Sequence, residues 1–334
     1  MNGIGFGIIG LGRIGSFHAR SLRDAISGAH LVAAAVDAPD RQRLLAAGTA
    51  PCELEESVEA LLARPDVEAV VIASPAVVHD GHIALAAAKG KPIFSEKPLA
   101  DTVPKAEAAA QAVRLAGVPF QIGFQRRYDR SYARARELIA AGAIGEVEMF
   151  RGISCDRLGP IEFLKTSGGL FMDLTSHDFD AARFLTGEEV TEVFAVGAVL
   201  VAPELTEFDD VDHGIVLLRF GNGALGVVQA SWRAPHGYDI RAEVHGTKGK
   251  VVAEVDEKFP ATLYDERGKV SARHDQFVER FEDAYRAELQ AFVSALRAGT
   301  QPTPGVADGL QAMRIAAAAT QSRRENRWVG VGQG

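Results

Sequence analysis

The sequence predicts an α/β protein in which an N-terminal doubly wound parallel sheet precedes an α+β domain with an open, largely antiparallel sheet. Over the first ~120 residues, short apolar strands alternate with helical segments, which is the pattern of a parallel sheet covered on both faces. From about residue 146 the strands are longer and are joined by turn residues. We place the domains at 1–123 and 124–334, and we allow for the last helix returning to the first domain.

The first domain opens with an apolar strand that runs into Gly10-Leu11-Gly12-Arg13-Ile14-Gly15. A helix at 16–26, a strand at 30–36 and a helix at 55–63 are expected next. Further strands are predicted at 69–73, 92–95 and 118–123, and helices at 79–89 and from Asp101 or Thr102 to 116. Gly90 and Gly117 lie where helices should stop.

The second domain has strand patterns at 147–155, 190–201, 213–220, 224–232, 238–245 and 251–255. The Gly221-Asn222-Gly223 turn predicts a hairpin between the third and fourth of these strands. One helix is expected at 169–185, and two long helices at 281–298 and 306–323 close the chain.

The composition narrows the class of protein. The 334 residues are 47% hydrophobic and 24% charged, which is typical of a soluble globular protein of two domains. A net charge of −8 argues against nucleic acid or an anionic membrane as the main partner. Cys52 and Cys155 give no disulfide framework, and no apolar run reaches the length of a membrane span. We therefore expect a cytoplasmic protein.

The glycine turn points to a dinucleotide. Gly10 allows a tight turn, Gly12 lets a pyrophosphate approach the backbone, and Gly15 lets the helix lie close to the strand. The helix N-terminus adds free N–H groups and partial positive charge. The alternative is a glycine turn that only tightens a β–α corner.

Asp37 ends the second strand and lies about 20 residues past Gly15, where an acid would accept hydrogen bonds from the adenosine ribose. Its carboxylate would repel a 2′-phosphate, so NAD is favoured over NADP. Arg41 and Arg43 follow closely, and their positive charges weaken this preference.

A lysine stands at the edge of the sheet where ligands bind. Glu96-Lys97-Pro98 follows the carboxyl end of a predicted parallel strand, so Lys97 can reach both a cofactor ribose and a substrate hydroxyl. Ser74-Pro75 and His79 follow the neighbouring strand and are expected beside the cofactor. The alternatives are a surface lysine, and a metal pair of His79 with His82 that lacks a third ligand.

A carboxylate and an imidazole are predicted to share a helix face at Asp173 and His177, which are four residues apart. Histidine carries protons near neutral pH, and a neighbouring carboxylate favours its protonated form. A surface ion pair is the alternative; a metal site with Asp178 and Asp180 lacks a recognised ligand spacing.

Taken together, these motifs resemble the glucose–fructose oxidoreductase, inositol dehydrogenase and rhizopine-catabolism (Gfo/Idh/MocA) family, over essentially the whole chain. The resemblance is carried by the glycine turn, Ala73-Ser74-Pro75, Glu96-Lys97-Pro98, Gly123-Phe124 and the Asp173–His177 pair. Within the family, the stretches at 124–129, 167–169, 177–180 and 237–240 are most similar to inositol 2-dehydrogenases.

The resemblance implies a Rossmann domain, a catalytic set of Lys97, Asp173 and His177, and a cyclic polyol or sugar as substrate. Our best expectation is oxidation of myo-inositol to 2-keto-myo-inositol by NAD without a metal, in a homotetramer or dimer formed through the second sheet. Other polyols or sugars and a non-catalytic NAD sensor are the alternatives. Candidate cofactor contacts are Gly10, Gly12, Arg13, Ile14, Gly15, Asp37, Ser74, Pro75, His79, Glu96 and Lys97. Candidate substrate contacts are Gln125, Arg126, Asp156, Arg157, Asp180 and Tyr238.

Overall fold

The computed structural model describes residues 3–48, 50–254, 257–258, 262–266, 268–270 and 272–332. They form two compact units, one of Met1–Gln125 with Tyr285–Gln311 and one of Arg126–Ala284 with Ala312–Gly334. The return of Tyr285–Gln311 to the first unit differs from the continuous second domain expected at 124–334. The physical reason is the helix α11 (Glu282–Ala298), which buries Leu289, Phe292 and Val293 in the core of the first unit.

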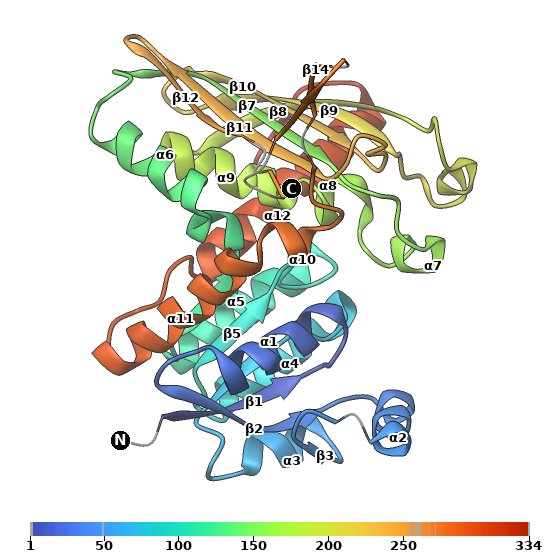
Figure 1. Cartoon of the computed structure of the whole chain (residues 1–334), viewed down its shortest axis with the longest axis vertical. Coiled ribbons are helices and arrows are strands. Elements are labelled where there is room, and N and C mark those ends of the chain that lie inside the picture. Colours follow the sequence, from blue (N-terminus) through green and yellow to red (C-terminus); the bar gives the residue numbers. More distant parts are fainter. Residues whose placement is uncertain are drawn as a thin grey trace. The chain divides into compact units, whose positions relative to one another are not determined.

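The first unit is built on a six-stranded parallel sheet (Figure 1). Its order is β3-β2-β1-β4-β5-β6, which is the doubly wound order with a switch between β1 and β4. The strands are β1 (Ile4–Ile9), β2 (Ala29–Ala35), β3 (Glu53–Glu55), β4 (Ala69–Ile72), β5 (Ile93–Glu96) and β6 (Phe120–Gly123). The predicted parallel sheet is confirmed.

The two faces of this sheet follow from the alternation of side chains along β1. Phe6 and Ile8 join the core formed with α11 and with α1 (Arg13–Asp24). Gly7 points to the other face, where a Cβ would lie 3.1 Å from Leu61 of α3 (Val58–Ala63). The unit also contains α4 (His79–Ala88) and α5 (Val103–Ala116), as predicted, and α2 (Ala38–Ala47), which was not.

The second unit contains a seven-stranded sheet of order β12-β11-β7-β10-β9-β8-β15. Within the described residues, β7 and β10 pair in parallel, and the other neighbouring strands of this sheet pair in antiparallel fashion. The strands are β7 (Val147–Cys155), β8 (Val190–Ala198), β9 (His213–Phe220), β10 (Leu225–Ser231), β11 (Asp239–Gly246), β12 (Gly249–Ala253) and β15 (Val329–Gly330). The predicted open, largely antiparallel sheet is confirmed, with the β9–β10 hairpin at Gly223. Residue 255 of the last predicted strand lies outside the described residues.

Helices cover one face of this sheet, where α9 packs on β7 and α6 on β12 (Figure 1). The helices are α6 (Arg130–Ala140), α7 (Ile161–Leu164), α8 (Gly169–Asp173), α9 (Ser176–Thr186) and α10 (Phe277–Arg280). The long α12 (Val306–Glu325) begins in the first unit and ends in the second. A small hairpin of β13 (Leu263–Asp265) and β14 (Gly268–Val270) is also present. Within the described residues, every helix is too short or too polar to cross a membrane.

The helix expected at 169–185 is two helices, because α8 ends at Asp173 and α9 begins at Ser176. At the turn, the Thr175 hydroxyl donates to the Phe171 carbonyl at 2.8 Å and the Ser176 hydroxyl donates to the Asp173 carbonyl at 3.4 Å. Hydroxyl side chains that bond to preceding carbonyls compete with the helical ladder. The assumption of one continuous helix through Asp173 and His177 was therefore wrong.

Candidate functional site

At the glycine turn after β1, the protein fills the space beside Gly10 and Gly15 but leaves the space beside Gly12 open. Gly10 has a φ of +94°, and a Cβ there would lie 2.7 Å from the Ala73 carbonyl oxygen. A Cβ at Gly15 would lie 2.1 Å from the Gly10 carbonyl oxygen, whereas a Cβ at Gly12 would have nothing within 4 Å. Packing of the chain itself therefore requires glycine at Gly10 and Gly15 but not at Gly12. Open space at the N-terminus of α1 fits the pyrophosphate of NAD.

Asp37 stands between β2 and α2. Its Oδ1 accepts the Asp40 N–H at 2.9 Å, so the side chain caps this helix. This cap orients the carboxylate at the carboxyl end of β2, beside the glycine turn, where the Gly10 N–H donates to the Ala35 carbonyl at 2.8 Å. Its contact with a ribose stays a prediction, and the side chain of Arg43 lies outside the described residues.

His79 joins the loops that follow β4 and β5. Its Nδ1 is 2.6 Å from the Pro98 carbonyl oxygen and its Nε2 is 2.6 Å from the Ser74 carbonyl oxygen. Burial lowers the pKa of His79, although both carbonyls favour the protonated ring. A neutral ring donates to one carbonyl at a time, so His79 holds the backbone on either side of the cofactor edge. The structure thus assembles Ser74, His79 and the Glu96-Lys97-Pro98 corner, as the sequence indicated.

Lys97 is the partly exposed residue of an otherwise buried corner. Glu96, Pro98, Leu99 and Ala100 are all buried around it. Glu96 Oε1 lies 2.7 Å from His18 Nε2, so the acid before Lys97 faces the protein core. The sequence had suggested a cofactor contact for Glu96, and that role stays a prediction.

In the second unit, two glycines set the start of α8. Gly168 and Gly169 have φ values of +87° and +84°. Asp210 Oδ1 accepts the Leu170 N–H at 3.1 Å, and a Cβ on Gly169 would lie 2.7 Å from the same oxygen. Burial raises the pKa of Asp210. Two residues with left-handed backbone and one acid therefore fix α8, which ends at Asp173.

Asp173 and His177 stand out in their segment by exposure. Between Leu170 and Ala182 these two residues are partly exposed, and every other residue is buried. The divided helix therefore turns an acid and an imidazole toward the surface of the second unit. Their catalytic role, like that of Lys97 in the first unit, stays a prediction.

Arg126 is part of a buried polar cluster. Its guanidinium donates to Asp178 Oδ1 at 2.7 Å and to the Ser154 hydroxyl at 3.0 Å, and that hydroxyl donates to Asp178 Oδ2 at 2.7 Å. Arg126 and Asp178 are 2% and 1% exposed. The cluster ties α9 to β7, so Arg126 has a clear structural role, and its predicted contact with substrate stays a prediction.

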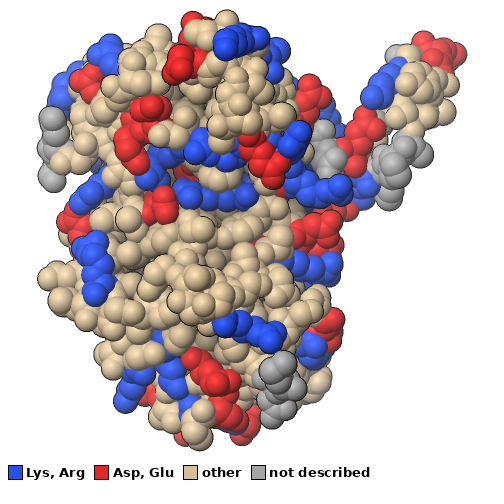
Figure 2. Space-filling view, turned by 90° about the vertical axis from the view of Figure 1, so that its left-hand side faces the viewer, with Lys and Arg blue, Asp and Glu red and all other residues tan. Residues whose placement is uncertain are grey.

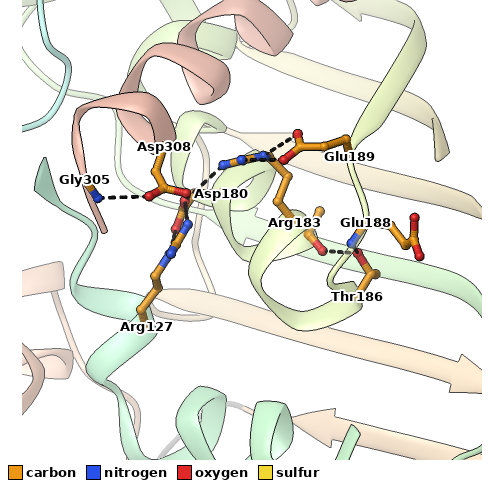
Figure 3. Close-up of polar contacts among 9 residues, drawn as sticks. Arg127, Asp180, Arg183, Thr186, Glu188, Glu189, Gly305 and Asp308 are labelled. Atoms are coloured by element: carbon orange, nitrogen blue, oxygen red, sulfur yellow. Dashed lines mark hydrogen bonds and ion pairs between the residues drawn. The ribbon is translucent and has the colours of Figure 1, made fainter. Parts of the chain in front are cut away.

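Asp180 makes the second buried pair, which Figure 3 shows. Arg127 donates Nε to Oδ2 at 2.9 Å and a terminal nitrogen to Oδ1 at 2.6 Å, which is the bidentate geometry of a strong pair. Arg183, one turn on, makes a similar fork to Glu189 at 2.8 and 2.6 Å (Figure 3). Asp180 is 1% exposed, so this network anchors α9.

The remaining predicted substrate residues differ in exposure. Gln125 and Tyr238 are buried, Asp156 is half-buried and Arg157 is exposed. Burial raises the pKa of Tyr238, and the Asp156 carboxylate adds to the rise. Arg157 reaches Asp275 at 3.0 Å. Asp156 and Arg157 are therefore the accessible members of this set.

Two buried residues of the first unit were not singled out by sequence reasoning. His18 and Glu288 are both fully buried and lie beside Glu96. A signal for Glu288 is present, since it occupies an apolar position in the pattern Ala284, Tyr285, Leu289 and Phe292.

His213 lies between an acid and a hydroxyl group, and this arrangement has a structural explanation. His213 Nδ1 is 2.6 Å from Asp212 Oδ1 and its Nε2 is 3.1 Å from the Ser231 hydroxyl. The Asp212 carboxylate, however, accepts the N–H groups of Leu200, Val201 and Ala202, and the Ser231 oxygen accepts the N–H of Arg233. These bonds shape loops, in line with a structural His213.

Charge is mixed on the surface. Among the described residues on the face in Figure 2, lysine and arginine side chains lie interspersed with aspartate and glutamate.

Burial raises the pKa of Cys155 to about 11, so its thiol stays protonated at neutral pH.

Family models match both parts of the chain. The oxidoreductase family with an NAD-binding Rossmann fold matches residues 4–124, and the GFO/IDH/MocA C-terminal domain matches residues 132–252. The chain is 38% identical to the myo-inositol 2-dehydrogenase of Thermotoga maritima, covering 97% of each. It is 37% identical to the scyllo-inositol 2-dehydrogenase (NAD(+)) of Bacillus subtilis, covering 95% of this chain and 93% of the relative.

Solved structures agree. The scyllo-inositol dehydrogenase of Lactobacillus casei with bound NAD(H) and scyllo-inositol superposes with a TM-score of 0.92 at 33% identity, covering 99% of this chain and 100% of that one. The glycine turn and the open space at Gly12 fit the same cofactor. The chain therefore belongs to the Gfo/Idh/MocA family and is an NAD-binding oxidoreductase of the type that acts on CH–OH groups.

Proposed function

We propose that this chain is an NAD-dependent inositol 2-dehydrogenase that oxidises myo-inositol to 2-keto-myo-inositol. The observation that carries the proposal is similarity over 95–97% of the chain, at 37–38% identity, to relatives that act on myo- and scyllo-inositol. Because relatives of both kinds are almost equally similar, scyllo-inositol is the second candidate substrate. Other polyols or sugars are weaker alternatives.

The catalytic roles follow from the needs of the reaction. Oxidation of a secondary alcohol removes a hydride and a proton, and NAD supplies the hydride acceptor when bound. His177, as neutral imidazole, takes the hydroxyl proton, and Asp173 orients the ring and stabilises its charged form. Lys97 donates a hydrogen bond to the reacting oxygen and favours its developing negative charge. The partial exposure of all three, each within a buried segment, supports this assignment.

Polyol specificity requires partners for the other hydroxyl groups, because unpaired polar groups are costly once buried. We assign this role to Gln125, Arg126, Asp156, Arg157, Asp180 and Tyr238. Asp156 and Arg157 are the accessible members, whereas Arg126 and Asp180 serve mainly by holding α9 in place.

We also propose that the open face of the second sheet joins subunits into a dimer or tetramer. This face carries Met149, Ile215, Leu217 and Leu225, which are 41–49% exposed on three neighbouring strands. Leu225 lies opposite Met149, and Val227 lies opposite Leu217. A contiguous exposed apolar area of this kind marks an interaction surface. The cytoplasm stays the predicted compartment.

The proposed activity is tested by NADH formation with myo-inositol, scyllo-inositol, chiro-inositol, glucose and xylose, each with NAD and with NADP. We expect the highest kcat/KM with myo-inositol and NAD. A higher kcat/KM with scyllo-inositol would make scyllo-inositol the preferred substrate and leave the proposed hydride transfer unchanged. No turnover of any of the five, in protein that binds NAD by calorimetry, would contradict the proposal and favour an NAD sensor.

The catalytic set is tested by His177→Asn and Lys97→Met. Each should lower kcat by about 10²–10⁴-fold, the usual contribution of a positioned acid–base group. His30→Asn and Lys89→Met, which change the same residue types at exposed positions, are the matched controls and should stay near native. If His177→Asn retained native kcat, His177 would not be the base.

A further inference from the structure

The core of the first unit contains three titratable side chains from three elements. His18 comes from α1, Glu96 from the end of β5 and Glu288 from the middle of α11. His18 and Glu288 are 0% exposed and Glu96 is 7% exposed. One nitrogen or oxygen atom from each lies within 4.8 Å of the others. Such a cluster is uncommon, because acids are rarely fully buried without a partner.

Only part of this cluster is paired. His18 Nε2 and Glu96 Oε1 are 2.7 Å apart. Both carboxyl oxygens of Glu288, in contrast, are buried and have no hydrogen-bond partner among the described residues. The Gln121 amide donates to the main-chain carbonyl of Glu288 at 3.0 Å and leaves its carboxyl untouched. Glu288 therefore carries a carboxyl group that the cluster has not satisfied, and His18 Nδ1 is the other buried atom of the three side chains without a hydrogen-bond partner among the described residues.

The surroundings are apolar and aromatic. The His18 ring packs edge-on against Phe94 at 5.3 Å and against Tyr285 at 6.1 Å between ring centroids. Gly123 packs its backbone on Glu96, since a Cβ there would lie 3.0 Å from Oε2. The titratable groups around Glu288 are Glu96 from β5, His18 from α1 and Tyr285 from α11 itself, while β6 contributes the neutral Gln121.

Two ionised carboxylates cannot both persist in such a setting. Two negative charges in a medium of low dielectric constant repel strongly, and each also loses its hydration. Burial raises the pKa of Glu288 well above its usual range, and the Glu96 carboxylate raises it further. Glu96 has an imidazole partner and Glu288 has none, so Glu288 is the group that takes up the proton.

We propose that Glu288 is a neutral carboxylic acid in the folded protein, and that this buried proton lets Glu96 remain charged beside His18 and so holds the corner that carries Lys97. Glu288 is thus a positioning residue that acts through Glu96. The protonation state stands on the cluster alone; the effect on Lys97 rests on the proposed function.

Infrared difference spectroscopy tests the proton without any turnover. The spectrum of the native chain minus that of Glu288→Gln, at about pH 7, should contain the C=O stretch of a protonated carboxyl group that shifts in D₂O. Loss of a carboxylate band instead would overturn the proposal. So would a stoichiometric divalent metal in the purified protein by elemental analysis, because the three groups would then be its ligands.

The pH dependence of stability gives a second test. A group whose folded pKa is raised binds more protons in the folded state, so its contribution is present at low pH and is lost as pH rises. The native Tm should therefore fall between about pH 6 and about pH 9 more steeply than that of Glu288→Gln. Asp283→Asn, which removes an exposed acid from the same helix, is the control and should follow the native curve. Parallel curves for native and Glu288→Gln would contradict a buried proton.

The positioning role is tested by rescue. Glu288→Leu removes the acid proton and should lower kcat about tenfold, whereas Glu288→Gln keeps a neutral donor of the same size and should stay within about twofold of native. Equal losses in both variants, or none in either, would overturn the link to Lys97. If native protein turned over no inositol yet gave the protonated-carboxyl band, the proposed function would fail and the buried proton would stand.

Discussion

The two units bury their acids in different ways. In the second unit Asp178 and Asp129 are each paired with a buried arginine, Arg126 and Arg280, at 2.7 and 2.8 Å. In the first unit Glu96 faces a histidine, and Glu288 has no cation beside it among the described residues. The comparison is thus between two buried acids that arginine holds in the second unit and two acids of the first unit that have no arginine partner among the described residues. The difference predicts that the two units respond differently to charge removal and to added atoms.

The largest effect is expected from breaking an ion pair in the second unit. Arg126→Leu leaves Asp178 buried and uncompensated, which should lower the free energy of unfolding by about 3–5 kcal/mol. Urea denaturation measures this loss. The double variant Arg126→Leu/Asp178→Leu should recover much of it, because the unpaired charge is gone. A double variant no more stable than Arg126→Leu would mean that the pair does not hold the unit as described.

In the first unit, adding a methyl group should lower stability more than removing a charge does. Gly15→Ala places a methyl group 2.1 Å from the Gly10 carbonyl oxygen, and overpacking of this kind costs about 1–3 kcal/mol. Gly12→Ala meets nothing within 4 Å, so stability should stay near native. Its NAD affinity, measured by calorimetry, should fall about tenfold or more, since the methyl group enters the pyrophosphate space. Native NAD affinity in Gly12→Ala would place the pyrophosphate elsewhere.

The smallest expected effect is a pH dependence of stability that comes from His79 in the first unit. Burial lowers the pKa of His79 from its usual 6.5, so its neutral form contributes stability above that value, and the contribution is lost as pH falls. The native Tm should drop by about 2 °C more than that of His79→Gln between about pH 7.5 and about pH 5.5. His30→Asn, at an exposed site, should behave as native. The same drop in His79→Gln would show that His79 carries no such contribution.

Much of the fold could be predicted because its signals are local. The glycine turn, the alternation of apolar strands with helices, and the Gly221-Asn222-Gly223 hairpin each depend on a few neighbouring residues. The strand β3 escaped prediction because it lacks such a signal, whereas α2 was missed although Asp37 caps its start and Gly48 ends it. β3 reads Glu-Leu-Glu and becomes a strand only by pairing with β2.

The sequence identified candidate site residues by their type and motif, but it could not show which residues they pair with. Lys97, Asp173 and His177 stand in recognisable motifs, whereas the pairing of Arg126 with Asp178 joins positions 52 residues apart. The break in the helix between Asp173 and Ser176 depends on the hydroxyl bonds of Thr175 and Ser176, which helix periodicity does not reveal. Glu288 was missed because Glu96, the acid that it lies beside, is on a strand far away in the chain.

The return of α11 to the first unit also sets an order for synthesis. Phe292 packs against Phe6 and Phe94, with ring centroids 6.1 and 5.9 Å away, so the N-terminal core lacks this side chain until the ribosome has passed residue 292. By then the chain of most of the second unit has been made. Domains usually complete themselves in order from the N-terminus. Here the unit that begins first must wait for a late helix, and a nascent chain stopped at residue 284 would expose the apolar surface that this helix covers.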